Sequence, residues 1–340
     1  MDIIFERGSV RTYWLNKICE ELFYAKSAVI NLDFKNDPFF SPFSLIFIIS
    51  CVKTFRKNNP RSKLIITPPS YSPCSPYGWV ERMGFISCLN EIFNQDHNEI
   101  IPSNNDNCLP IEMKKLSEFI SYDKFSREDM NESILIKSDD LTRILTHLDK
   151  GPAFDILRYS VREIIRNVYE HSNSSTITIC AQYWKDKNKV QMVIFDYGIG
   201  ISNSLKFNPA YKNISPIELL KLACLPGVSG NARDIRNKSQ TNKWQNSGYG
   251  LYMTSSICKN DGDFYVISNE DAIFIKGKER AYYKIKGFRG TLIRMTLCLD
   301  DLENFNAKFQ KYIQTAKNIA AHINGAKMVD ASFASQMLTL

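Results

Sequence analysis

The segment that most constrains the fold is VREIIRNVYEHS, residues 161–172, which predicts an amphipathic helix. At about 100° per residue, its apolar side chains form one broad stripe that has to face a core. That stripe consists of Leu157, Val161, Ile164, Ile165 and Val168. Glu163, Asn167 and Glu170 fall within about 60° of one another on the opposite side. This polar line is either a solvated helix face or a set of side chains that binds something, and the helix alone leaves both open.

Three further motifs follow this helix along the chain. DYGIGI, residues 196–201, comes after the apolar strand VQMVIF, and a carboxylate followed by two glycines lets a ligand lie against bare backbone. NSGYGL, residues 246–251, precedes a predicted helix, whose first N–H groups and dipole favour phosphates. FRGTLIRMTL, residues 288–297, has a Gly-Thr pair at the head of a strand. Each motif is weak alone, but their order and spacing together are specific.

Glu163-x-x-x-Asn167 followed by DxGxGI, GxGL and GT resembles the Bergerat-fold (GHKL) ATPases over about residues 149–299. That superfamily holds type II topoisomerases, large heat-shock chaperone ATPases, mismatch-repair ATPases, and the histidine and anti-sigma-factor kinases. The Asn-x-x-x-His ending, Asn167 to His171, is similar to the histidine-kinase branch. The resemblance implies an α/β (α+β) sandwich with a mixed sheet and helices on one face, and it implies ATP and Mg²⁺ as cofactors.

The resemblance also implies a role for each matching residue. Asn167 would bind Mg²⁺, a hard cation that prefers oxygen ligands, and Glu163 would orient or deprotonate the attacking water or hydroxyl. Asp196 would accept the hydrogens of the adenine amino group. The other nucleotide-binding positions are Gly198 and Gly200 at the base, Gly248, Tyr249, Gly250 and Leu251 at the phosphates, and Thr291, which would support the adenine end. His171 is expected to be structural, and Glu170 is compatible with a solvated neighbour.

A basic segment lies between the two glycine motifs. Arg233, Arg236, Lys238 and Lys243 outnumber its single acid, Asp234. The segment is either a mobile basic loop or a lid that closes over the triphosphate. The chain has no GxxxxGK[ST], so it is not a P-loop protein.

Residues 1–100 predict a separate α/β unit. SAVINLDF (residues 27–34) and SKLIIT (residues 62–67) read as strands, and the apolar run between them reads as a helix from Phe43 to about Phe55, so a parallel crossover unit is expected. INLDF, FFSPFSLIFIISCVKTFRKNNP, KLIITPP and YGWVERMGF are similar to the STAS domain of anti-sigma-factor antagonists.

The sequence departs from the pattern of the STAS family at one motif. That family tends to carry an acidic-Ser-Ser-Gly phosphoacceptor turn, whereas this chain has Ser41-Pro42-Phe43-Ser44, with Phe43 at the acceptor position. The unit is therefore expected to be a docking or regulatory platform rather than a phosphorylation substrate. An ordinary α/β domain is the alternative.

The remaining segments complete the expected organisation. Residues 101–148 are expected to be a linker with a helical segment, 149–300 the ATP-binding domain, and 301–340 a C-terminal helix and tail. Three β-rich stretches are expected between Asp263 and Leu299. The C-terminal helix is expected to pack on its own domain, with homodimerisation as the alternative.

Composition and charge narrow the classes of partner that we expect the chain to bind. The net charge of +7 permits an anionic ligand, but no Lys/Arg run is dense enough to indicate nucleic acid. Nine cysteines without a CxxC favour free thiols in a reducing cytoplasm. The N-terminus MDIIFERGS does not read as a signal peptide, and the most apolar run, residues 38–52, is shorter than the ~20 residues of a membrane span, so no membrane partner is expected.

These observations favour a cytoplasmic, Mg-ATP-binding regulatory protein in which lid closure switches the binding of a protein partner, accompanied by slow ATP hydrolysis. One alternative is an anti-sigma-type serine/threonine kinase acting on a separate STAS-like protein, and another is a nucleotide-binding scaffold without turnover. A sensor histidine kinase is disfavoured because no histidine lies on a long helical hairpin before the ATPase domain. A topoisomerase or mismatch-repair role is disfavoured because no transducer domain follows Leu299.

Overall fold

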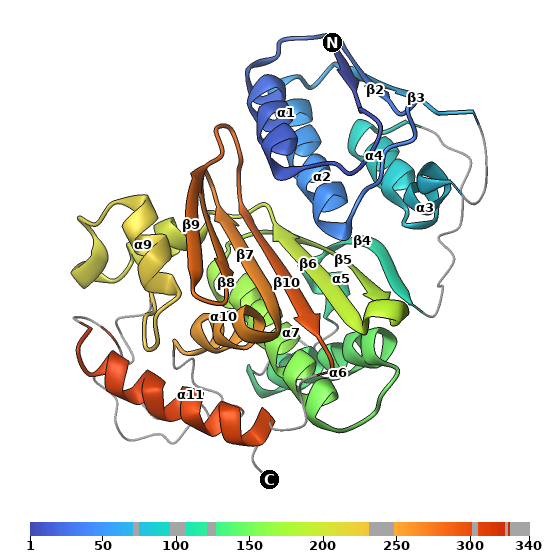
Figure 1. Ribbon diagram of the computed structural model, residues 1–340. Helices are drawn as coiled ribbons and strands as arrows, with labels where there is room; N and C mark the ends of the chain where they lie inside the picture. The colour runs from blue at the N-terminus through green and yellow to red at the C-terminus, as the bar shows by residue number, and fades with distance from the viewer. Residues whose placement is uncertain are drawn as a thin grey trace.

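The computed structural model describes residues 1–70, 75–95, 107–120, 127–230, 248–300, 305–323 and 326. These residues form a mixed α/β structure with a three-stranded parallel sheet and a seven-stranded antiparallel sheet (Figure 1). No helix in the described ranges is both long and apolar enough to cross a membrane. The eight cysteines among the described residues are free thiols, as the absence of a paired pattern predicts.

The N-terminal unit carries the parallel sheet and its helices. Its elements are β1 (Asp2–Ile4), α1 (Thr12–Tyr24), β2 (Val29–Asp33), α2 (Pro42–Asn58), β3 (Lys63–Thr67), α3 (Pro76–Arg82) and α4 (Phe85–Phe93). The strand order is β1-β2-β3, with both pairs parallel. The predicted strand–helix–strand crossover is therefore confirmed by β2, α2 and β3.

Helix α2 is the apolar run that the sequence predicts as a buried helix. It begins at Pro42, after a capping box in which the Ser41 amide donates to Ser44 Oγ (2.7 Å) and the Ser44 amide donates to Ser41 Oγ (3.3 Å). Almost all of its side chains up to Phe55 are buried, because a helix that is apolar on every side has to be covered on every side. It packs on α1 and α4 and, on another side, on two strands of the large sheet.

The large sheet has the order β4-β5-β6-β10-β7-β8-β9. Its strands are β4 (Cys108–Lys115), β5 (Thr176–Trp184), β6 (Lys189–Asp196), β7 (Gly262–Ser268), β8 (Asp271–Lys276), β9 (Glu279–Lys284) and β10 (Thr291–Cys298). Every pair is antiparallel, so the expectation of a mixed sheet is wrong. Short connections join β5 to β6, β7 to β8 and β8 to β9, and short connections of this kind make antiparallel neighbours.

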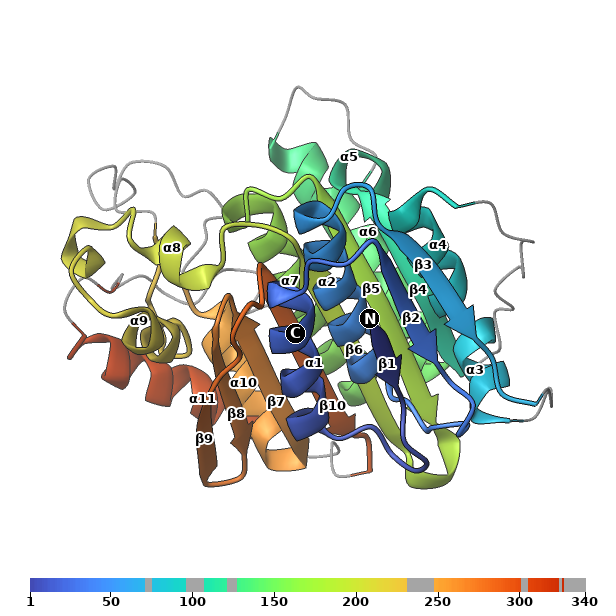
Figure 2. The same ribbon diagram turned by 90° about the horizontal axis from the view of Figure 1, so that it is seen from above.

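Helices that follow β4 in the chain cover one face of this sheet. They include α6 (Arg127–Thr146), α7 (Pro152–His171) and α10 (Gly250–Asp261), and the shorter or peripheral helices are α5 (Leu116–Phe119), α8 (Ile201–Leu205), α9 (Pro216–Ala223) and α11 (Phe305–Ala320). Figure 2 shows α2 on the opposite face of the sheet from α7 and α10. The long helices α6, α7 and α10 thus lie on one face, as expected, while the N-terminal unit covers the other.

Residues 101–148 were expected to be a linker with a helical segment. Their described part contributes the edge strand β4 to the large sheet and the helix α6, which packs on α7. Between Asp263 and Leu299 there are four strands rather than three, because β9 is a largely exposed, polar edge strand that carries little apolar signal. Helix α11 packs on α10, which agrees with packing on its own domain.

Candidate functional site

The described residues line an open pocket between α7, α10, the turn after β6 and the start of β10. Seven of the predicted nucleotide-binding residues line it: Asn167, Asp196, Gly200, Gly248, Gly250, Leu251 and Thr291. Segments separated by more than a hundred residues in the sequence therefore meet at one hollow.

Asp196 is the buried carboxylate of this pocket. It ends β6, opposite Thr291 at the start of β10, and it is 4% exposed. Its Oδ1 accepts a hydrogen bond from the Gly198 amide at 2.9 Å. Burial raises the pKa of Asp196 to about 7, although the bonds from the Gly198 amide and the Thr291 hydroxyl oppose this shift. Near neutral pH this carboxyl is therefore poised to accept a further hydrogen bond.

The turn after Asp196 has no room for side chains at its glycines. A Cβ on Gly198 would overlap the carbonyl oxygen of Ser172, and one on Gly200 would overlap the side-chain amide of Asn269. Gly200 also has φ +83°, a conformation that favours glycine. The Ile199 amide donates to the Ser172 carbonyl at 2.8 Å, so the turn is fastened to the end of α7.

The second glycine motif is equally tight. Gly248 has φ +73°, and a Cβ there would come within 2.8 Å of the Val228 carbonyl oxygen. Gly250 begins α10, and a Cβ there would overlap Oε2 of Glu163. Tyr249 between them is buried and is not among the residues that line the pocket, so its side chain anchors the motif instead of facing a ligand.

The polar line on α7 is not a solvated face, so that interpretation of the sequence is wrong. Glu163 is 5% exposed, and its Oε1 lies 2.7 Å from Arg162 Nη2 and 4.0 Å from Arg166 Nη1. Arg166 also pairs with Glu170 at 3.1 Å. Asn167 is the member of the line that reaches the pocket, whereas Glu163 lies against Gly250 and outside the lining residues.

His171, expected to be structural, lines the pocket with its ring 3.7 Å from Glu170 Oε2. The sequence indicates its place only through the Asn-x-x-x-His spacing. Its neighbour Ser172, which the motifs do not single out, also lines the pocket and supplies the carbonyl that holds the 196–200 turn.

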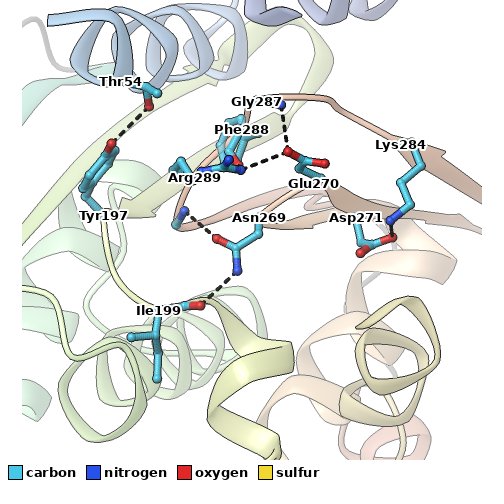
Figure 3. A network of polar contacts seen from close by, with 11 residues as sticks. Thr54, Tyr197, Ile199, Asn269, Glu270, Asp271, Lys284, Gly287, Phe288 and Arg289 are labelled. Atoms are coloured by element: carbon cyan, nitrogen blue, oxygen red, sulfur yellow. Dashed lines mark hydrogen bonds and ion pairs between the residues drawn. The ribbon is translucent and has the colours of Figure 1, made fainter. Parts of the chain in front are cut away.

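Asn269 is the most important residue that the motifs miss. Its side-chain amide donates to the Ile199 carbonyl at 2.9 Å, and its Oδ1 accepts from the Gly290 amide at 3.2 Å (Figure 3). It therefore ties the turn after β6 to the residue before Thr291. Its φ of +50° is a conformation that asparagine tolerates in turns, and an Asn between two β-rich stretches is the sequence signal that points to it.

The basic lid with Arg233, Arg236, Lys238 and Lys243 lies outside the described residues. In the described ranges, no group of three or more His, Cys, Asp or Glu side chains is arranged to hold a metal ion. Any Mg²⁺ at Asn167 would therefore need oxygen ligands from a bound molecule and from water.

Comparisons with protein-family models, with curated proteins and with solved structures found no match to this chain. The interpretation of the pocket rests on the residues of the chain and on how the fold arranges them.

Proposed function

We propose that the chain binds Mg-ATP in this pocket and acts as an ATP-controlled regulatory protein. The observation that carries the proposal is the meeting of α7, the 196–200 turn, the 248–251 motif and Thr291 around one buried carboxylate. The same segments, in the same order, are those on which the resemblance to the Bergerat-fold ATPases rests. We propose that fold for residues 149–300.

The adenine would lie against the turn after β6. Asp196 offers a carboxylate oxygen to the exocyclic amino group, and the Thr291 hydroxyl holds that carboxylate. Gly200 lines this part of the pocket without a side chain, while Gly198, outside the lining residues, lets the turn pack against Ser172. The carboxylate and the bare backbone therefore fit an adenine ring.

The phosphates would lie at the N-terminus of α10. This helix has no side-chain cap, and Gly248 and Gly250 line the pocket at its start, so backbone N–H groups are exposed to a ligand there. Asn167 faces the same pocket and would supply one oxygen to Mg²⁺, which usually keeps several waters and bridges substrate phosphates. The residues present therefore fit magnesium that arrives with the nucleotide.

Turnover depends on Glu163, and its surroundings favour a second candidate function. A general base needs a carboxylate oxygen within reach of the attacking water. Oε1 of Glu163 is held by two arginines, and Glu163 does not line the pocket. This arrangement favours a nucleotide-binding scaffold with little or no hydrolysis over an efficient ATPase.

For residues 1–100 we propose a STAS-like platform that docks a regulatory protein. In support, Ser41 and Ser44 use their hydroxyls to cap α2, and Ser44 is buried. Both hydroxyls serve the helix start, so phosphorylation there would require opening the cap. A docking role fits these serines better than a phosphoacceptor role.

The experiment is a thermal-shift titration with ATP, with and without EDTA, followed by incubation with γ-labelled ATP. We expect Mg-ATP to raise the melting temperature, because a ligand that binds only the folded state stabilises it. Label released as phosphate indicates an ATPase, label on an added STAS-like protein indicates the kinase alternative, and stabilisation without either indicates the scaffold. Absence of any shift at millimolar Mg-ATP contradicts the proposal.

A further inference from the structure

A second, wider hollow lies where the C-terminal ends of α2 and α4 meet the end of β4 and the first residue of β5. Its open volume is about 1360 Å³, and we call it the basic groove. Five cationic side chains line it: Lys53, Arg56 and Lys57 on α2, and Lys114 and Lys115 on β4. Figure 1 shows α2, α4 and β4 beside one another, away from α10.

The α2 cations form no ion pair in the part of the chain that the structure describes, although the charge of Glu91 acts on Lys53. Among the described residues, no carboxylate lies within 4 Å of Lys53, Arg56 or Lys57, whereas Lys114 pairs with Glu112 at 3.5 Å and Lys115 with Glu118 at 3.3 Å. Positive charge near the C-terminus of a helix also interacts favourably with the helix dipole. The dipole accounts for cations in the last turn of α2 but not for Lys53, which lies before that turn, nor for the lysines of β4.

Lys53 is the cation with the least water around it. It donates to Thr176 Oγ1 at 3.2 Å and lies over the Tyr197 ring, 5.5 Å from its centre. Burial lowers the pKa of its ammonium. An anion placed in the groove would compensate this desolvated charge.

We propose that the basic groove binds an acidic segment of a protein partner. The two carboxylates among its lining residues, Glu91 and Glu118, would repel any anion, so they do not distinguish a peptide from a phosphate backbone. Ile92 and Met113 give the groove apolar patches, which a peptide with alternating acidic and small apolar residues matches. These apolar side chains beside the cations favour a protein segment over nucleic acid.

The proposal stands apart from nucleotide binding, because none of the lining residues of the groove lines the nucleotide pocket. It is tested without nucleotide. The probe is a fluorescein-labelled twelve-residue peptide of alternating glutamate and alanine, titrated with the full chain at low salt and read by fluorescence anisotropy. A labelled twelve-nucleotide oligothymidylate is titrated in parallel.

The variant is the double substitution Lys57→Glu and Lys114→Glu, two exposed residues of the groove. Its matched control is Lys26→Glu and Lys212→Glu, two exposed lysines outside it, with the same change in net charge. We expect the groove variant to bind the peptide about tenfold more weakly or worse, and the control within about twofold of the parent chain. Superimposable thermal melts show that both variants are folded.

Three results overturn the proposal. The first is no binding of the peptide by the parent chain at low salt. The second is equal loss of binding in the groove variant and its control, which indicates a general charge effect. The third is oligothymidylate binding at least as tight as that of the peptide and lost with the groove variant, which assigns the groove to nucleic acid.

Discussion

At the residue scale, the buried carboxylate of Asp196 lowers the stability of the fold, and the same group is proposed to bind adenine. Its carboxyl is buried, and its folded-state pKa of about 7 is well above the value of 3.8 that an exposed aspartate has. Between these two pH values the folded chain binds more protons than the unfolded chain, so this residue makes the free energy of unfolding fall as pH rises through that window. Above pH 7 the fold carries the full cost of a buried negative charge.

Asp196→Asn should therefore stabilise the chain without nucleotide. Removal of the charge is expected to raise the free energy of unfolding by up to about 4 kcal/mol at pH 8, and by little at pH 4 where the carboxyl is protonated. Urea denaturation at both pH values measures this difference. The same variant should weaken ATP binding, because the Gly198 amide would bond the remaining side-chain oxygen and leave an NH2 donor facing the adenine amino group. A gain of equal size at pH 4 and pH 8 would show that ionisation is not its cause.

Gly250 offers a second test at this scale. Alanine normally stabilises a helix relative to glycine, but a Cβ at Gly250 would overlap Oε2 of Glu163. Gly250→Ala is expected to lower the free energy of unfolding by about 1–3 kcal/mol, as other overpacked sites do. Adding Glu163→Ala should recover much of that loss, which a double-mutant cycle by urea denaturation measures. Strictly additive effects would mean that the two residues do not meet.

At the element scale, the turns of the pocket are held by one bridging side chain. Asn269 follows β7 and fastens the turn after β6 to the residue before β10. Asn269→Gly keeps the positive φ accessible while deleting both bonds. It is expected to weaken ATP binding several-fold, because the turns then lose their fixed separation.

The matched control is Asn188→Gly, also at a positive φ with two side-chain hydrogen bonds, between β5 and β6 and outside the pocket. It should lower the melting temperature by a similar amount and leave the dissociation constant for ATP unchanged. If both variants weaken ATP binding equally, Asn269 has no special role in positioning the turns.

The same elements show what a single sequence predicts. Periodicity predicts α2, α7 and the strands that flank them, because their apolar patterns are long and regular. The family resemblance selects the glycines and Asp196, and the structure leaves no room for a Cβ at the four glycines of these motifs. The edge strand β4 is missed because Pro110 and the Asn-rich residues before the strand favour a loop, and β9 is missed because it is short and largely exposed.

The ion pairs of α7 are missed for a different reason. Glu163 and Glu170 pair with arginines of the same helix, and the helical wheel carries no information about what covers a polar face. Asn269 is missed because its bonds join residues about 20 and 70 positions away in sequence, which no local pattern encodes. Long-range polar contacts of this kind require the fold.

At the scale of the whole molecule, the two sheets share a core. Phe288, before β10, lies with its ring centre 5.4 Å from that of Phe47 on α2 and 6.1 Å from that of Phe195 on β6. A buried apolar cluster runs continuously through α2 and the near face of the large sheet. The two sheets are therefore expected to unfold together.

Differential scanning calorimetry should give one cooperative transition for the full chain. Phe288→Ala should shift that single transition downward, with a loss of about 3–5 kcal/mol in the free energy of unfolding, because it leaves a cavity in the shared core. Phe207→Ala, at a ring that is 72% exposed, is the control and should leave it unchanged. Two separate transitions would show that the N-terminal unit is independently stable.

The central claim is that this molecule binds adenine nucleotide with magnesium at the pocket between α7 and α10. Isothermal titration calorimetry of the full chain with Mg-ATP, compared with Mg-GTP, tests it most directly. We predict saturable binding of one Mg-ATP per chain and much weaker binding of Mg-GTP, whose ring presents a carbonyl where adenine has the amino donor for Asp196. No saturable heat with Mg-ATP, or equal affinity for both nucleotides, would contradict the account.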